Sequence, residues 1–233
     1  MATQYQTTQS TPIAFTAAVR LQQSLVASAE KRTLLWLAER TPRWINSDHL
    51  TLLGFAAQLL AGVSYGLARW HRYALLLVIL FLALNWLGDS LDGTLARVRN
   101  CQRPRYGFYV DHIVDTFAAL FLMGGLALSG YVHPAIAFGL LVAFLMLSIE
   151  AYLTTYALGQ FQLSYWKLGP TEIRLLLALG NLALLRNVNV NIVGMKFLLF
   201  DVGGAVAIVG MMLMLVVSAI RHTRALYVEE RIQ

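Results

Sequence analysis

The chain has 233 residues, of which 58% are hydrophobic and only 13% are charged, with a mean hydropathy of +0.61. Soluble domains carry about 25% charged residues, so this composition excludes an ordinary soluble fold and favours one polytopic membrane domain. The formal net charge is +6, but no basic run is interleaved with exposed aromatic residues, which argues against nucleic-acid binding.

The start of the chain predicts a polar tail followed by a helix on the membrane surface. Residues 1–12 are polar and precede no apolar segment with a cleavage site, so we expect a disordered tail and no secretory signal. Residues 13–46 predict an amphipathic helix, with leucines on one side and basic residues on the other. Trp36 and Trp44 favour the headgroup layer. An ordinary leader helix packed on the domain is the alternative.

Six apolar segments follow, each with the length of about 20 residues needed to cross a bilayer. They cover 48–68, 73–98, 107–131, 133–158, 171–190 and 199–221. No strand pattern competes with the helical one. We therefore expect an all-α, polytopic membrane protein with a six-helix domain over 47–222 and a cytosolic tail over 223–233.

The basic residues predict the orientation of these spans. With six spans both ends lie on one side of the membrane, and that side holds fourteen of the 18 lysines and arginines. The positive-inside rule places it in the cytosol, as in a protein of a bacterial-type inner membrane. The single cysteine, Cys101, excludes an intramolecular disulfide and fits a loop that faces a reducing compartment.

Four of the six aspartates fall within 27 residues of the second and third spans: Asp89, Asp92, Asp111 and Asp115. Acidic side chains are costly in a membrane and therefore indicate a functional site. Asp89 and Asp92 share one helical face, and Asp111 and Asp115 form a stripe with Gly107. Because the connection between the two spans is short, the spans lie antiparallel and the four carboxylates can converge.

Four carboxylates at close range repel one another unless a cation lies between them. Oxygen ligands favour Mg²⁺, Mn²⁺ or Ca²⁺, and no set of cysteines and histidines is present for zinc. Two ions would neutralise a diphosphate and stabilise the attacking and leaving oxygens. On the same face as Asp89, Gly93 and Ala96 allow close approach of a substrate, and Arg97 can bind a phosphate.

The depth of the aspartates indicates the class of substrate. Asp89 lies 16 residues after Tyr73, about 24 Å along a helix. This places it just inside the cytosolic edge of a hydrocarbon core about 30 Å thick. A lipid's headgroup phosphate lies at that level, so we expect chemistry at the inner leaflet.

Residues 89–115 read DSLDGTLARVRNCQRPRYGFYVDHIVD. This stretch resembles the signature of the CDP-alcohol phosphotransferase (phosphatidyltransferase) family. That signature is D-x-x-D-G-x-x-A-R, a gap of eight or nine residues, and G-x-x-x-D-x-x-x-D. Every specified position is filled here, with a gap of nine.

The resemblance implies a six-helix fold, usually a homodimer, with a polar cavity open to the cytosol. Asp89, Asp92 and Asp111 would be ligands of two divalent cations, Mg²⁺ or Mn²⁺. Asp115 would be both a ligand and the general base that takes the proton from the attacking hydroxyl. The reaction would be a direct displacement at the phosphorus attached to the alcohol, with release of CMP. Four residues would line the CDP site: Gly93, Ala96, Arg97 and Gly107.

Family members often begin the first span with a Pro-Asn-x-x-Thr-like segment. This chain has Ser47-Asp48-His49-Leu50-Thr51 and keeps only the threonine. We therefore add Thr51 to the predicted CDP site. Asp48 is either a contact of this site or an N-cap of the first span.

Charged residues near the cytosolic face predict the acceptor side of the site. Lys167, Glu172 and Arg174 flank the start of the fifth span, and Glu150 lies in the fourth span at a depth near that of Asp89. Glu172 would contact a cationic acceptor or is an acidic residue favoured in the first turn of a helix. Glu150 would line the acceptor cavity or pair with an arginine.

The Asp111-His112 pair and the stretch Gly169-Pro170-Thr171-Glu172 resemble the eukaryotic choline/ethanolamine branch of the family. In that branch His112 would be near the acceptor, either as a hydrogen-bonding helper or as a base.

In the predicted reaction, a small polar alcohol displaces CMP from a CDP-linked donor, CDP-diacylglycerol, within the membrane. The alternative is a donor of the CDP-choline or CDP-ethanolamine type with diacylglycerol as the acceptor lipid. Two more remote alternatives are a prenyltransferase of the UbiA type and a cation transporter. The first usually has more spans and a different first motif, and the second would spread its acidic residues through the depth of the bilayer.

Overall fold

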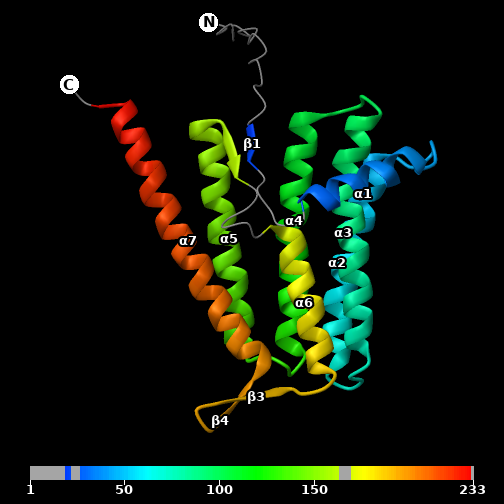
Figure 1. The fold of residues 1–233 in the computed structure, drawn as a ribbon, viewed down its shortest axis with the longest axis vertical. Coiled ribbons are helices and arrows are strands. Elements are labelled where there is room, and N and C mark those ends of the chain that lie inside the picture. The colour runs from blue at the N-terminus through cyan, green and yellow to red at the C-terminus, as the bar shows by residue number, and fades with distance from the viewer. Residues whose placement is uncertain (1–18, 22–26, 163–168, 232–233) are drawn as a thin grey trace, which may run out of the picture.

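A computed structural model describes residues 19–21, 27–162 and 169–231 of the chain. Within them lie seven helices and four short strands (Figure 1). The helices are α1 (Ala27–Arg40), α2 (Ser47–Ala68), α3 (Ala74–Val98), α4 (Pro104–Leu128), α5 (Pro134–Leu158), α6 (Pro170–Leu184) and α7 (Leu199–Glu229). The strands are β1 (Val19–Leu21), β2 (Gln160–Gln162), β3 (Asn189–Ile192) and β4 (Met195–Leu198).

Local sequence signals start and stop these helices. The Asn46 side chain accepts a hydrogen bond of 3.0 Å from the His49 N–H and so caps α2. Prolines stand in the first turn of α4, α5 and α6, where a missing N–H costs nothing. Gly159, with φ of 66°, ends α5 in the left-handed conformation.

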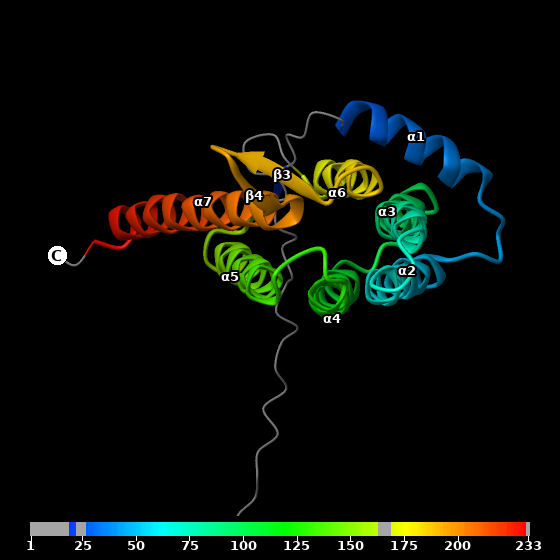
Figure 2. The same cartoon turned by 90° about the horizontal axis from the view of Figure 1, so that it is seen from below.

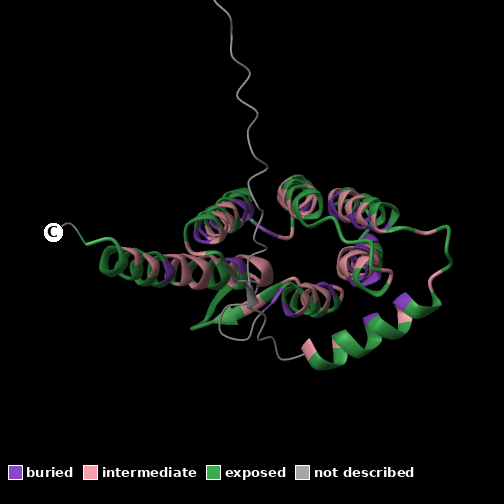
Figure 3. Ribbon diagram, turned by 90° about the horizontal axis from the view of Figure 1, so that it is seen from above, coloured by how far each residue is buried: buried purple, intermediate pink, exposed green. Residues whose placement is uncertain are grey.

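Among the described residues, five helices are long and apolar enough to cross a membrane: α2, α3, α4, α5 and α7. Buried residues lie mainly where helices face one another, and exposed residues cover much of the outer faces (Figure 3). Many of these exposed residues are large and apolar, such as Leu52, Val63, Leu76 and Val206. Since such surfaces require a lipid environment, the chain is an all-α, polytopic integral membrane protein.

The fifth predicted span, 171–190, is shorter in the structure. Helix α6 has 15 residues and ends at Leu184, so its length of about 22 Å is less than the roughly 30 Å of the hydrocarbon core. The count of six spans therefore stays a prediction.

The expectation that no strands occur was wrong after α6. Strands β3 and β4 form an antiparallel hairpin in which Ile192 pairs with Met195. Val193 and Gly194 make its two-residue turn with φ of 50° and 80°, the turn geometry that suits a hairpin. The alternation of asparagines with Val190 and Ile192 accounts for the change from helix to strand.

The predicted helix over 13–46 is also shorter in the structure. Helix α1 covers Ala27–Arg40 and stops two residues before Pro42, which disfavours helix in the residue before it. Val19–Leu21 pairs in parallel with Gln160–Gln162, so this part was wrongly assigned to helix. The predicted tail over 1–12 lies outside the described residues. At the other end α7 continues to Glu229, through most of the expected tail over 223–233.

The helices form a bundle with the connection between α3 and α4 at the same end as the C-terminal end of α7, and the β3–β4 hairpin at the opposite end (Figure 1). Helix α1 lies outside the bundle beside α3 (Figure 2). Its Leu34 and Ala38 pack with Leu50, Leu91 and Leu95 in a small apolar cluster.

Two pairs of glycines bring α2 into close contact with its neighbours. A Cβ on Gly88 of α3 would lie 2.5 Å from the backbone nitrogen of Gly54. A Cβ on Gly125 of α4 would overlap the carbonyl oxygen of Gly62. Helix α2 therefore lies against α3 and α4 at distances that only glycine allows, as is common between membrane helices.

We expect Gly125→Ala to lower the thermal stability of the purified protein in detergent, because the new methyl group overlaps the backbone of α2. Overpacking of this kind costs about 1–3 kcal/mol. Gly124→Ala is the matched control, since a Cβ there meets nothing within 4 Å and alanine favours helix by up to about 1 kcal/mol. Equal melting temperatures of the two variants would contradict the close packing of α2 on α4.

Cys101 tests the orientation. It is exposed in the connection between α3 and α4, so a membrane-impermeant maleimide should label it in inside-out vesicles and not in right-side-out vesicles. The variant Cys101→Ser with Lys196→Cys, which moves the thiol to the β3–β4 hairpin, should show the opposite pattern. Labelling of both proteins from the same side would overturn the predicted topology.

Candidate metal and substrate site

The aspartates predicted to bind metal come from two consecutive helices, both of which pack against α2. Asp89 is in the second half of α3, and Asp111 and Asp115 are in the first half of α4. Each of the three offers a carboxylate oxygen, and these oxygens lie within 4.8 Å of one another. All three residues are partly buried. The three side chains could hold a metal ion.

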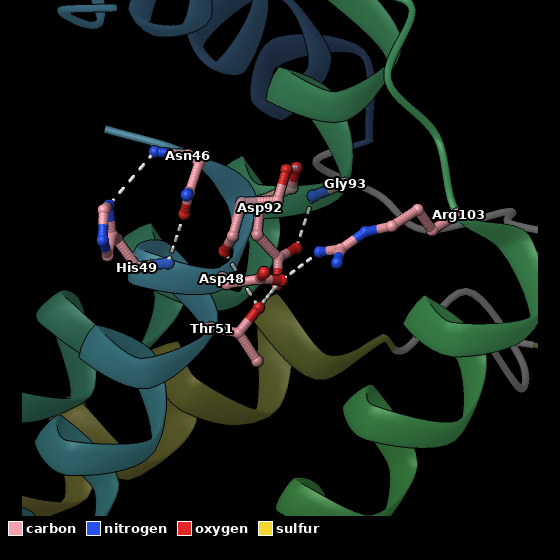
Figure 4. Close-up of polar contacts among 8 residues, drawn as sticks. Asn46, Asp48, His49, Thr51, Asp92, Gly93 and Arg103 are labelled. Carbon is pink, nitrogen blue, oxygen red and sulfur yellow. Dashed lines mark hydrogen bonds and ion pairs between the residues drawn. The ribbon is translucent and has the colours of Figure 1, made fainter. Parts of the chain in front are cut away.

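Asp92, the fourth predicted ligand, lies at the edge of this group. Its Oδ2 accepts a hydrogen bond of 2.6 Å from the Thr51 hydroxyl of α2, and its Oδ1 accepts one from the Gly93 N–H (Figure 4). The Ser47 hydroxyl donates to the Asp92 carbonyl at 3.0 Å. The start of α2 thus fixes the position of Asp92 beside the other three carboxylates.

A cavity of about 10 Å³ lies among the aspartates, which is about the space that one water molecule occupies. Thr51 and Asn85 are its other polar lining residues. No histidine or cysteine lines it, and hard oxygen donors of this kind favour Mg²⁺ or Mn²⁺ over zinc. The cavity therefore fits an ion and is too small for a nucleotide.

Arg174 of α6 lies against this group of aspartates. Its Nη2 donates to Asp89 Oδ2 at 2.6 Å, and its Nε donates to Asn85 Oδ1 at 2.8 Å. Asn85 is buried and also donates to the Gly54 carbonyl at 3.0 Å. Sequence reasoning missed Asn85 as a site residue, although a buried amide one turn before Asp89 on the same helical face was a signal for it.

Two other residues predicted for the acceptor side, Glu150 and Glu172, have hydrogen-bond partners outside the group of aspartates. Glu150 of α5 is buried, and its Oε1 lies 2.6 Å from His222 Nδ1 of α7 and accepts a hydrogen bond of 3.0 Å from Thr154. Of the two predicted roles for Glu150, lining the acceptor cavity or pairing with an arginine, neither describes this contact with a histidine. Glu172 accepts a hydrogen bond of 2.9 Å from the Gly169 N–H at the start of α6. Lys167 lies outside the described residues.

His112 lies beside the aspartates but is turned toward aromatic neighbours. Its Nδ1 lies 2.6 Å from the Phe108 carbonyl oxygen and 3.9 Å from Asp111 Oδ2. The imidazole packs on the Phe108 ring and edge-on against Tyr152 of α5, with ring centroids 4.1 Å and 4.9 Å away. These contacts orient the imidazole.

Open space lies over the two glycines predicted to line the CDP site. A Cβ on Gly107 would meet nothing within 4 Å, and one on Gly93 would meet only Arg97 Nη1 at 3.5 Å. Arg97 Nη2 donates to the Thr94 hydroxyl at 2.9 Å. Ala96 follows one turn after Asp92 on the same helix. A substrate can therefore approach the backbone of α3 and α4 beside the aspartates.

Asp48 is not the N-cap of α2, because Asn46 has that role. It forms an ion pair with Arg103 at the start of α4 (Figure 4). Arg99 donates hydrogen bonds to the carbonyls of Thr41 and Pro42, at 2.8 Å and 3.0 Å. These contacts connect the α3–α4 loop to the start of α2 and to the segment that precedes it.

The sequence model of a protein family described as CDP-alcohol phosphatidyltransferase matches residues 44–219. The match begins after α1 and covers helices α2 to α6 and the first two thirds of α7. A comparison with curated proteins finds no match. The family match agrees with the resemblance of residues 89–115 and gives no support to the UbiA-type or transporter alternatives.

We expect Asp111→Asn to weaken Mn²⁺ binding to the purified protein, measured by electron paramagnetic resonance of the free ion. The loss should exceed the roughly 10–100-fold cost of removing a group that only orients a ligand. Glu150→Gln is the control, because it removes a buried carboxylate from the α5–α7 contact and leaves the aspartates unchanged. Equal losses in both variants would show that Mn²⁺ does not bind at the aspartates.

Proposed function

The chain belongs to the CDP-alcohol phosphatidyltransferase family, and we propose that its donor is CDP-diacylglycerol and its acceptor a small polar alcohol. Membership implies a transferase that makes phospholipids from a CDP-alcohol in the membrane. The observation that carries the proposal is the convergence of Asp89, Asp111 and Asp115 within 4.8 Å, beside Arg174 as a cation for an anionic substrate group.

The proposed step is a displacement at the phosphorus that bears the diacylglycerol. The acceptor's hydroxyl oxygen forms a bond to this phosphorus while the bond to the bridging oxygen of CMP breaks. The electron pair of that bond leaves with CMP, and the hydroxyl proton passes to Asp115. Asp115 fits this role because it lies in the same group of carboxylates as Asp89 and Asp111.

Two divalent cations, Mg²⁺ or Mn²⁺, would be held by Asp89, Asp92, Asp111 and Asp115. Bound there, they would neutralise the charge of the diphosphate. Thr51 and the Gly93 N–H hold the Asp92 carboxylate in place, and Asn85 holds the Arg174 guanidinium on Asp89. Thr51 thus contributes to the donor site by orienting Asp92.

The donor would lie over the cytosolic ends of α3 and α4. Gly93 and Gly107 leave space there for a ribose or pyrimidine, and Ala96 presents only a methyl group. Arg97, one turn after Gly93, can donate two parallel hydrogen bonds to a phosphate.

The acceptor would be an alcohol phosphate. Arg174 lies on Asp89, whereas Glu150 is engaged with His222 and Glu172 with the Gly169 N–H. Both carboxylates suggested for a cationic acceptor thus have partners away from the aspartates. A cationic amino alcohol as the acceptor is therefore not favoured. Lys167 would supply a second positive charge near the start of α6.

We also propose a homodimer in a bacterial-type inner membrane, with both termini and the site in the cytosol. The support for the orientation is the excess of basic residues on the side of the termini. The support for the dimer is the family resemblance alone.

A panel of labelled alcohols with CDP-diacylglycerol tests the choice of acceptor, with CMP release and lipid chromatography as readouts. We expect turnover with an alcohol phosphate and little with an amino alcohol. Arg174→Ala should raise the KM for the alcohol phosphate about tenfold or more, because a charged hydrogen bond of this kind contributes roughly 1.5–3 kcal/mol. The KM for CDP-diacylglycerol should change less. Turnover with an amino alcohol only, unaffected by Arg174→Ala, would contradict the proposal.

A further inference from the structure

Helix α1 lies outside the residues that the family model matches, 44–219, yet it contacts the helices of the site. Its Glu30 is partly buried in the first turn, on the face that carries Leu34 and Ala38. Glu30 Oε1 accepts hydrogen bonds from Thr171 Oγ1 at 2.7 Å, from Trp86 Nε1 at 2.8 Å and from Ser90 Oγ at 3.3 Å. One carboxylate oxygen therefore has three neutral donors.

These donors come from two different helices that both carry site residues. Trp86 and Ser90 lie on α3, three residues before and one residue after Asp89. Thr171 lies on α6, three residues before Arg174. Glu30 thus joins α3 to α6 through α1, close to the place where Arg174 and Asp89 join them directly. Hydrogen bonds to a charged acceptor are stronger than those between neutral groups.

Helix α6 depends on such polar contacts because it has little buried apolar surface. Only Glu172, Asn181 and Leu184 of its 15 residues are buried, and Ile173, Leu175 and Leu176 are more than half exposed. Toward its far end, Asn181 donates to the Tyr65 hydroxyl of α2 at 2.7 Å. At the end that carries Arg174, the contacts to α1 and α3 come from Thr171 and Arg174 themselves.

Helix α1, which carries Glu30, is packed against α3 by buried apolar side chains. Leu34 and Ala38 are 6% and 3% exposed and pack against Leu91 and Leu95 of α3. Because α1 is fixed to α3 by this apolar contact, the Glu30 carboxylate has a set position relative to Asp89. The bond from Thr171 then sets the first turn of α6 relative to the same aspartate.

We propose that Glu30 is a positioning residue, which holds the first turn of α6 in place through Thr171 and thereby keeps Arg174 beside the aspartates. Its effect on catalysis rests on the proposed function, because it acts through the role of Arg174 toward the acceptor. Its effect on the position of α6 does not depend on any substrate.

Kinetics with CDP-diacylglycerol and an alcohol phosphate test the effect on the site. Glu30→Ala should raise the acceptor KM severalfold and leave the donor KM within about twofold, while Glu30→Gln, whose amide oxygen can still accept, should restore most of the loss. Glu39→Ala, an exposed change on the same helix, should match the wild type. In the Arg174→Ala background Glu30→Ala should have little further effect. The inference would be overturned if the effects of Glu30→Ala and Arg174→Ala on the acceptor KM multiplied in the double variant. It would also be overturned if Glu30→Ala had the same acceptor KM as the wild type.

Hydrogen–deuterium exchange of the metal-free protein tests the position of α6 without any substrate. Amides of residues 173–177 should exchange faster in Glu30→Ala than in Glu39→Ala, while those around Asn181 stay protected. If Glu30→Ala fails to fold, Thr171→Val takes its place. It removes the hydroxyl that donates to Glu30, leaves the packing of α1 on α3 unchanged, and should show the same faster exchange. Unchanged exchange at 173–177 would overturn the proposal for Glu30, whatever reaction the enzyme catalyses.

Discussion

Mutual repulsion of carboxylates in a membrane protein is the constraint on which the rest of this structure depends. Three carboxylate oxygens within 4.8 Å of one another would each repel the next by roughly 3–4 kcal/mol at an effective dielectric constant of 20. The three pairs together approach the whole stability of a typical domain, about 5–15 kcal/mol. One guanidinium, that of Arg174, offsets part of this cost, and the proposed cations, when bound, would offset the remainder.

The surrounding helices are arranged to hold these carboxylates in spite of that repulsion. Gly54 and Gly88 let α2 approach α3 closely, which places Thr51 within hydrogen-bonding distance of Asp92. Arg103 connects the start of α4 to Asp48 of α2. Helix α6 supplies the only cation of the described residues that is paired with Asp89. Close backbone contacts, hydrogen bonds and ion pairs of four helices thus come together around the site.

The clustering of the aspartates was predictable from sequence because it follows from their spacing along two consecutive helices. The four-residue stripe of Asp111 and Asp115, and the three-residue step from Asp89 to Asp92, fix which side chains share a face. A short connection then brings the faces together. The family match over residues 44–219 confirms the family that this spacing indicated.

Contacts between helices distant in sequence were not predictable in the same way. The depth of Glu150 was inferred from its place in α5, but its partner depends on the rotation of α5 toward α7 and its His222. The sequence placed Arg174 near the start of the fifth span, but its hydrogen bond to Asp89 depends on how α6 packs against α3. The end of α6 at Leu184 was missed because Val188, Val190 and Ile192 continue an apolar pattern that is equally compatible with strand.

Turnover by Asp115→Asn is the most direct test of the claim that these carboxylates carry the chemistry. The measurement is CMP release from CDP-diacylglycerol at saturating Mg²⁺ and acceptor, for purified wild type and variant. A general base contributes typically 10²–10⁴-fold, and Asp115 also belongs to the group that would hold the metal, so the rate should fall by at least that range. A variant that retains a tenth of the wild-type rate would contradict the account and make His112 the residue to test as the base.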